Sequence, residues 1–143
     1  MEIHLFFACF IMFGLHMVVL LLLFINRVNN VRAGITDPKY FKTYDIQAQI
    51  PRFTKQLARN YSNQFEAPTL FYAVIAMVLA MGLSHIHLVI LAYAYVGMRV
   101  LHSLTHITSN KIYPRMVLFL LSAFTLTLLW LKAFLAALEK FSF

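Results

Sequence analysis

The feature that most constrains this chain is an apolar run from Leu5 to Ile25, interrupted only by Gly14 and His16. A helix of this length is long enough to cross the hydrocarbon layer of a bilayer, which is about 30 Å thick. Composition agrees, since 62% of the residues are hydrophobic and the mean hydropathy is +0.76. A soluble domain is closer to half apolar. The sequence therefore predicts an integral membrane protein.

Three further apolar runs follow the first, and nothing in the sequence suggests a second domain. We expect one all-α membrane domain over residues 1–143, a bundle of four transmembrane helices. The predicted spans cover about residues 4–26, 65–83, 86–107 and 116–138. Pro68 predicts a kink or a helix start in the second span. Lys132 lies near the end of the fourth, where its stem can reach the interface.

Basic residues are concentrated in the segment between the first two runs. Seven of the twelve lysines and arginines lie between Arg27 and Arg59, and the formal net charge is +7. This pattern is typical of a cytosolic loop, so we expect residues 27–62 inside and both termini outside. Attraction to anionic lipid explains most of these charges, and no nucleic-acid partner is expected. A short helix is predicted near Ile50 to Asn60.

One polar stripe interrupts the third apolar run. On a helix, Arg99, His102, Ser103, His106 and Asn110 fall within an arc of about 100°. A charge in mid-helix costs about 2.5–3.5 kcal/mol, so Arg99 should face the bundle interior and be paired.

The candidate partner of this arginine is Glu66, the acidic residue beside a span on the cytosolic side. We expect an Arg99–Glu66 ion pair between the second and third spans. The alternative is that this pair only fixes the register of two helices. For Asn63 and Glu66 themselves, a helix N-cap with Glu at the third position is a second interpretation.

His102 and His106 lie one helical turn apart and leave two interpretations open. They could bind haem or a metal, which would make the protein a haem or metal carrier. The sequence offers no CxxC motif or acidic cluster to complete such a site, and as neutral hydrogen-bonding groups the two histidines suit a polar pocket better. His85 and His87 are expected at the membrane interface, and no metal site is predicted. Cys9 is the single cysteine.

Two motifs resemble the MAPEG superfamily, the membrane-associated proteins in eicosanoid and glutathione metabolism. The segment ARNYSNQFEAPTLFY carries the family's R-x-x-x-N-x-x-E pattern as Arg59, Asn63 and Glu66. The segment MRVLHSLTHITSNKIYPR carries its third-helix pattern as Arg99, His102 and Ser103, and an arginine at the start of the fourth helix as Arg115. The chain is most similar to the microsomal glutathione transferase branch.

This resemblance implies a homotrimer that binds glutathione in cytosol-facing pockets between subunits, with lipophilic substrates arriving from the bilayer. Six positions match those that bind or frame glutathione in family members, and one, Arg115, is the implied catalytic residue beside the thiol. The function implied is a glutathione-dependent transferase or peroxidase acting on lipophilic electrophiles. The matching residues are Arg59, Asn63, Glu66, Arg99, His102 and Arg115, to which we add His106.

The sequence also departs from the family pattern. His106 stands where many members carry Tyr, and Met116 stands where the prostaglandin-synthesising branch carries Ser. Prostaglandin synthesis is therefore not expected. Non-catalytic members bind lipid and present it to a partner, so a lipid-binding or scaffolding protein is the alternative function. The compact loops favour a bacterial inner membrane over the endoplasmic reticulum.

Overall fold

Every regular element in the described part of the chain is an α-helix. The computed structural model describes residues 1–44, 50–83 and 85–142, so residues 45–49 of the predicted cytosolic loop lie outside it. The all-α prediction is confirmed for this part. The helices are α1 (Glu2–Arg32), α2 (Tyr40–Thr43), α3 (Arg52–Asn63), α4 (Ala67–Ala80), α5 (Ile86–Ile107) and α6 (Ile112–Phe141).

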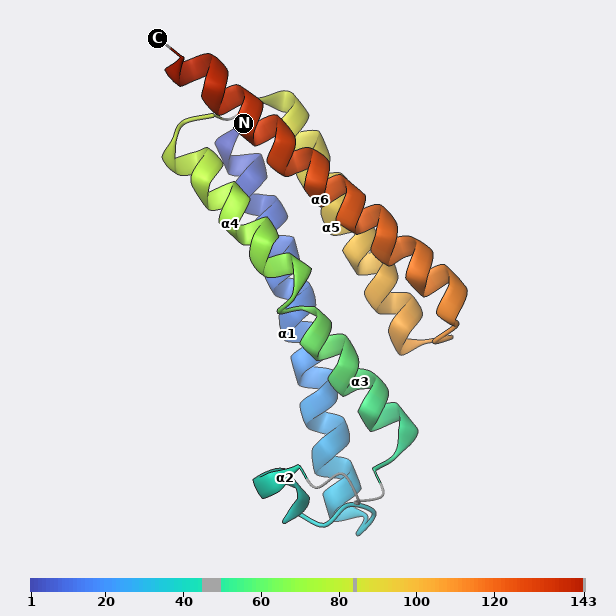
Figure 1. The fold of residues 1–143 in the computed structure, drawn as a ribbon. Helices are drawn as coiled ribbons and strands as arrows, with labels where there is room; N and C mark the ends of the chain where they lie inside the picture. Colours follow the sequence, from blue (N-terminus) through green and yellow to red (C-terminus); the bar gives the residue numbers. More distant parts are fainter. Residues whose placement is uncertain (45–49, 84, 143) are drawn as a thin grey trace.

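The helices run along one long axis. α1 extends through most of the molecule, and α3 and α4 run back beside it (Figure 1). α5 and α6 form an antiparallel hairpin that packs along the other side. α1 contacts α3, α4 and α5, while α6 contacts α4 and α5. The two chain ends lie at the same end of the bundle, opposite α2 (Figure 1).

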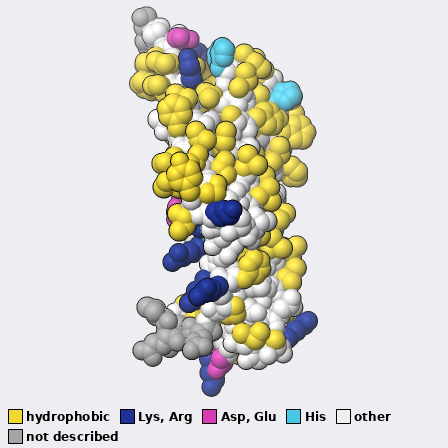
Figure 2. Space-filling view, turned by 90° about the vertical axis from the view of Figure 1, so that its right-hand side faces the viewer, with side chains coloured by type: hydrophobic (Ala, Val, Ile, Leu, Met, Phe, Trp, Pro, Cys, Tyr) yellow, Lys and Arg dark blue, Asp and Glu magenta, His cyan; other side chains and the backbone are white. Residues whose placement is uncertain are grey.

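Three of the described helices, α1, α5 and α6, are long and apolar enough to cross a membrane. Large apolar side chains cover their outer faces over a wider area than soluble proteins expose to water. Figure 2 shows hydrophobic side chains over much of the upper part of one face and basic side chains gathered toward the lower end. The most exposed phenylalanines on α1 and α6 are Phe6, Phe10, Phe24, Phe124 and Phe134.

The second predicted span contains a helix break. α4 has 14 residues, about 21 Å of helix, and Pro68 lies in its first turn, as expected from the sequence. Proline has no N–H to donate to the carbonyl of Gln64 and its ring clashes with that carbonyl, which disfavours one continuous helix. α3 accordingly ends at Asn63 and α4 begins at Ala67. Glu66 takes the N-cap position of α4 and makes no side-chain cap. The interpretation of Asn63 as an N-cap is therefore wrong: it is the last residue of α3.

The helix α3 agrees with the short helix predicted near Ile50 to Asn60. It is amphipathic, and its buried face carries Thr54, Leu57 and Asn60. This face packs on α1 and α5, so the segment is not a free linker.

The apolar core lies in the half of the bundle that contains α4. Side chains from α1, α4, α5 and α6 meet there, and Phe71 stacks on Tyr95 with ring centroids 4.7 Å apart. Lys140 closes this end, because its ammonium group donates to the carbonyl of Met81 at 2.7 Å. The lysine thereby satisfies a carbonyl just beyond the end of α4, which the helix itself leaves open. The apolar contacts thus fix α4 against the α5–α6 hairpin.

The other half of the bundle is held partly by polar contacts. Between α1 and α3, the Thr54 hydroxyl donates to Asn26 Oδ1 at 2.7 Å and accepts from Asn30 Nδ2 at 2.7 Å. Thr54 is buried. Its one hydroxyl therefore satisfies groups on two successive turns of α1, which sets the register of α3.

Replacing Thr54 by valine keeps the shape of the side chain and removes this hydroxyl. We expect Thr54→Val to lower the free energy of unfolding by about 1–3 kcal/mol, because two asparagine side chains lose a hydrogen-bond partner. Unfolding by SDS titration of the purified protein measures this change.

Thr127→Val is the matched control. Thr127 is exposed and its hydroxyl donates to the carbonyl of Ala123 in its own helix. Thr127→Val should change the free energy of unfolding by no more than about 0.5 kcal/mol. Equal effects of both substitutions would show that the contact does not stabilise the packing of α3 on α1.

Candidate functional site

A buried polar seam joins α3 to α5. Asn60 Nδ2 donates to Ser103 Oγ at 2.8 Å, and Gln64 Nε2 lies 3.4 Å from Asn60 Oδ1. One turn earlier, Gln56 Nε2 donates to the main-chain carbonyls of His106 and Ile107, the latter at 3.1 Å. These are carbonyls at the end of α5 that have no partner within the helix. Side chains on α3 therefore hold the polar half of α5 in place.

Arg99 lies at the deep end of this seam. It is 0% exposed, and its Nη2 donates to the main-chain carbonyl of Asn63 at 2.6 Å. Its Nε and Nη1 are buried without a hydrogen-bond partner among the described residues. The ion pair expected between Arg99 and Glu66 is therefore wrong as a direct contact. The reason is that Glu66 lies at the helix break with an exposed side chain, while the carbonyl at the end of α3 is nearer to the guanidinium.

His102 links α5 to the start of α6. Its Nδ1 lies 3.0 Å from the main-chain carbonyl of Arg115. A carbonyl can only accept, so Nδ1 carries the proton in this contact. The opposite nitrogen, Nε2, is buried and has no partner among the described residues. The ring is thus held in one orientation, with one nitrogen still available.

The guanidinium of Arg115 is positioned by two side chains. Its Nη1 donates to Asn110 Oδ1 at 2.7 Å and lies 3.4 Å from His106 Nε2. Because arginine only donates, His106 Nε2 is the acceptor. The polar stripe predicted Asn110 on the same helix as Arg99. This prediction is wrong, because α5 ends at Ile107. Asn110 instead lies in the turn with φ +47°, a left-handed conformation that asparagine tolerates better than most residues.

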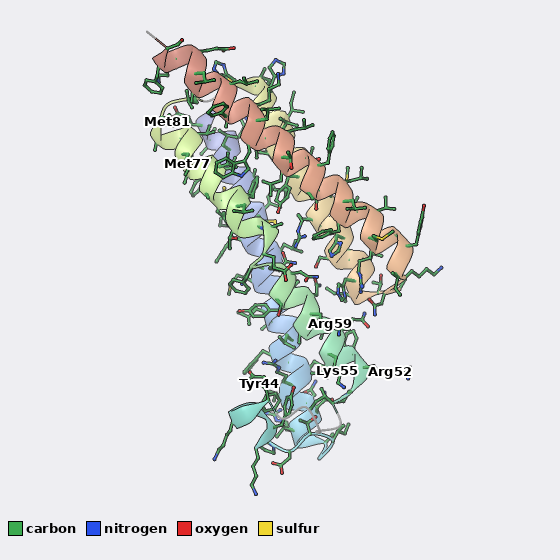
Figure 3. The ribbon with its side chains drawn as sticks, in the orientation of Figure 1. Tyr44, Arg52, Lys55, Arg59, Met77 and Met81 are labelled. Atoms are coloured by element: carbon green, nitrogen blue, oxygen red, sulfur yellow. The ribbon has the colours of Figure 1, made fainter. Side chains whose placement is uncertain are left out.

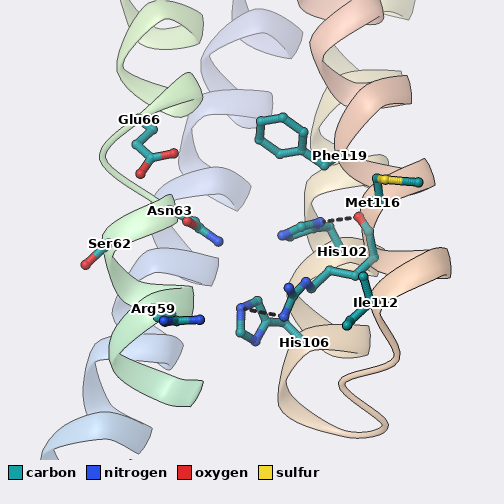
Figure 4. Close-up of a pocket in the computed structure, with 10 residues that line it drawn as sticks. Arg59, Ser62, Asn63, Glu66, His102, His106, Ile112, Met116 and Phe119 are labelled. Carbon is teal, nitrogen blue, oxygen red and sulfur yellow. Dashed lines mark hydrogen bonds between the residues drawn. The ribbon is translucent and has the colours of Figure 1, made fainter. Parts of the chain in front are cut away.

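A cavity of about 580 Å³ lies between α3 and the α5–α6 hairpin. α3 and the break before α4 form one wall, and α5 with the first turns of α6 forms the other (Figure 4). Arg59 and Asn63 point across the cavity toward His102 and His106 (Figure 4). The residues that line the cavity are Arg59, Ser62, Asn63, Glu66, His102, His106, Ile112, Arg115, Met116 and Phe119.

Six of the seven candidate residues from the sequence line this one cavity. The seventh, Arg99, lies behind the wall and is bonded to the backbone of Asn63. The amides of α3 and its C-cap were missed, although Gln56, Asn60 and Gln64 follow one another at four-residue spacing and could have been recognised as a polar helix face. The apolar lining from α6, including Phe119, carried no sequence signal.

The chemistry of this cavity is that of an anion site with one acidic group. Two guanidinium groups and one carboxylate line it, along with two imidazoles. The imidazole rings of His102 and His106 lie 6.0 Å apart. Within the described residues, no group of three or more His, Cys, Asp or Glu side chains could hold a metal ion. The side chains of this cavity offer hydrogen bonds and positive charge to a ligand.

Comparison with known protein families gives a match over nearly the whole chain. The model of the MAPEG family matches residues 5–135. The chain belongs to the MAPEG family. This confirms the resemblance found in the two sequence motifs, and the family includes proteins that use glutathione as well as proteins with other functions. No curated protein matches the chain, and no solved structure does.

The unpaired nitrogens of Arg99 lead to a stability prediction. We expect Arg99→Met to leave the free energy of unfolding within about 1 kcal/mol of the wild type, because an apolar side chain relieves the cost of burying an incompletely bonded charge. Asn60→Leu should lower it by about 1–3 kcal/mol, since Ser103 and Gln64 lose their partner.

Both variants are compared with the wild type by SDS titration without added ligand. Glu66→Gln serves as the control for the ion pair and should shift the free energy by no more than about 0.5 kcal/mol, because Glu66 is exposed. If Arg99→Met and Glu66→Gln each lowered the free energy of unfolding by several kcal/mol, the result would support a direct Arg99–Glu66 ion pair.

Proposed function

We propose that this protein is a glutathione-dependent transferase or peroxidase that acts on lipophilic electrophiles. The observation that carries the proposal is the guanidinium of Arg115, which Asn110 and His106 position at the cavity lined by Arg59, Asn63 and Glu66. Glutathione is the co-substrate expected from the family.

The charges of the cavity suit glutathione. The tripeptide carries two carboxylates and one ammonium group, and arginine binds carboxylates through paired N–H donors. Arg59 supplies such donors from α3, and the Glu66 carboxylate can accept from the ammonium group. Arg99 has two unpaired nitrogens behind Asn63, so a small rearrangement of this wall would add a third guanidinium.

The role proposed for Arg115 is to stabilise the thiolate. A free thiol has a pKa of about 8.5, so only a few per cent is ionised at neutral pH. A guanidinium beside the sulfur favours the charged form and lowers the pKa of the bound thiol. The thiolate then attacks an electrophilic carbon to form a thioether, while a leaving group departs or the adduct takes up a proton. With a hydroperoxide, the sulfur takes the terminal oxygen as a sulfenic acid and the alcohol is released. A second glutathione then converts the sulfenic acid to the disulfide and water.

The lipophilic substrate would approach over α6. Ile112, Met116 and Phe119 line the cavity on this side, and each has an exposed side chain. An apolar substrate dissolved in the bilayer could reach the sulfur across this edge, while glutathione enters from the aqueous side.

The assembly follows the family pattern in this proposal. The chain forms one membrane domain over residues 1–143 and assembles as a homotrimer, with glutathione held between neighbouring subunits. The segment 65–83, which includes α4, is the second of four spans, at about residues 4–26, 65–83, 86–107 and 116–138. Residues 27–62 face the cytosol and both termini lie outside, with a bacterial inner membrane as the expected location.

A non-catalytic lipid-binding or scaffolding role is the second candidate, favoured by a separate apolar cavity. This cavity of about 220 Å³ lies between α4 and α6, where Met77, Met81, Trp130 and Phe134 are among its lining residues. Figure 3 shows Met77 and Met81 at the upper end of α4. Such a surface suits an acyl chain and contributes nothing to thiol chemistry.

Arg115→Gln separates these two candidates. We expect the substitution to lower kcat for glutathione conjugation by about 10²-fold, because the thiolate of glutathione loses a charged hydrogen-bond donor. The ultraviolet absorbance of the bound thiolate should disappear while glutathione still binds, as measured by calorimetry on the purified protein in detergent.

Arg52→Gln is the matched control. Arg52 is exposed at the start of α3, on the same face as Arg59 but two turns away, and it does not line the cavity. Its loss should therefore leave kcat and the thiolate signal unchanged. If the wild type binds no glutathione and shows no thiolate absorbance, the transferase proposal fails and the lipid-binding role stands.

A further inference from the structure

A second cavity, with two arginines in a mainly apolar lining, lies at the other side of the molecule's basic end. Its volume is about 470 Å³, and it shares no residue with the candidate glutathione site. Five of its lining residues belong to α1, one to α2 and one to the C-cap of α2. In Figure 1, α2 lies on the other side of α1 from α3. The residues that line it are Phe24, Arg27, Val28, Val31, Arg32, Phe41 and Tyr44.

Arg27 is held within this cavity by aromatic rings. Its guanidinium carbon lies 5.3 Å from the ring centre of Phe41 and 5.8 Å from that of Tyr44. Both distances are within the range of cation–π attraction. The Nε of Arg27 is buried and has no hydrogen-bond partner among the described residues. The arginine is therefore fixed in place with donor capacity left over.

The lining combines positive charge with apolar surface. Two of the seven lining residues are arginines and none is acidic. The other five are aliphatic or aromatic, and Phe24 at the membrane side is 61% exposed. A ligand that matches this cavity carries a negative head and an apolar tail.

The position along α1 places the cavity at the level of lipid headgroups. The apolar run of α1 ends at Ile25, so Arg27 lies about 3 Å and Arg32 about 10 Å beyond its end. The headgroup layer on each side of a bilayer is roughly 5–8 Å thick. Arg27 therefore lies at the depth of the phosphates, and the long side chain of Arg32 can reach back to the same depth.

We propose that this cavity binds one anionic phospholipid from the leaflet at the polar end of α1. The phosphate accepts hydrogen bonds from Arg27 and Arg32, which arginine provides in the paired geometry that suits phosphate oxygens. An acyl chain descends along Phe24 and Val28 into the hydrocarbon layer.

This proposal is more specific than a general attraction of basic residues to anionic membranes. General attraction contributes about 1 kcal/mol for each lysine or arginine near the surface, wherever that residue lies. A built site instead depends on the two arginines that line the cavity. Lys39 and Lys42 lie on or beside α2, are exposed, and do not line the cavity, so they offer the same loss of charge without the site.

Native mass spectrometry of the purified full-length protein tests the proposal. The probes are phosphatidylglycerol and phosphatidylcholine with identical acyl chains, and sn-glycerol 3-phosphate as a headgroup without chains. We expect one phosphatidylglycerol per chain to be retained at least about tenfold more tightly than phosphatidylcholine, and glycerol 3-phosphate not to be retained. Equal retention of the two lipids, or binding of glycerol 3-phosphate as tight as that of phosphatidylglycerol, would overturn the proposal.

The double variant Arg27→Gln/Arg32→Gln should weaken phosphatidylglycerol binding by about tenfold or more, whereas Lys39→Gln/Lys42→Gln should change it less than about threefold. Equal losses in the two pairs mean general attraction only, and the site proposal fails.

The arginine variants need a check of folding and a milder substitution. The thermal midpoint in lipid-free detergent shows whether each variant is folded. Arg27→Lys keeps the charge but loses the planar fork, so it should weaken phosphatidylglycerol binding by roughly two- to fivefold. Binding unchanged in a folded Arg27→Lys protein contradicts the paired contact of Arg27 with the phosphate.

Discussion

The break between α3 and α4 is the constraint on which the polar half of this structure depends, because a carbonyl left open there accepts from the buried guanidinium of Arg99. The side chain is fully buried among helices, where an unpaired charge is costly. Its hydrogen bond goes to the carbonyl of Asn63, which is open because α3 ends at this residue. Pro68 follows five residues later and disfavours a continuous helix through this point. The helix break thus supplies the acceptor that a regular helix would have used for itself.

The bundle has two halves with different physical character. Around α4 the helices meet through apolar side chains, whereas α3 meets α1 and α5 largely through buried amides and hydroxyls. Apolar packing is tolerant of small shifts, but hydrogen bonds are directional and fix register. The cavity lies where the two halves join, so its walls are positioned by bonds to backbone carbonyls and not by shape alone.

Two cavities lined by arginines lie on different faces of the basic end. One is open between α3 and the α5–α6 hairpin, and its arginines stand among imidazoles and amides. The other lies on the far side of α1, and its arginines stand among aromatic and aliphatic side chains. The surroundings explain why similar charges lead to different proposals: a small soluble anion needs polar partners on all sides, whereas an amphiphile needs a polar end and an apolar wall.

The sequence by itself determined the all-α membrane class, the MAPEG family and six of the cavity's ten lining residues, because apolar run length and short motif spacing are local properties. It also predicted a kink or a helix start at Pro68, and α4 begins at the neighbouring Ala67. Only the tertiary structure decided the partner of Arg99, since carbonyls exposed by a helix break leave no mark in side-chain identity. Likewise Asn110 reaches Arg115 from a left-handed turn and not from the helix face that periodicity predicts. Contacts made by the backbone, and by residues beyond a helix end, depend on where the chain turns in space.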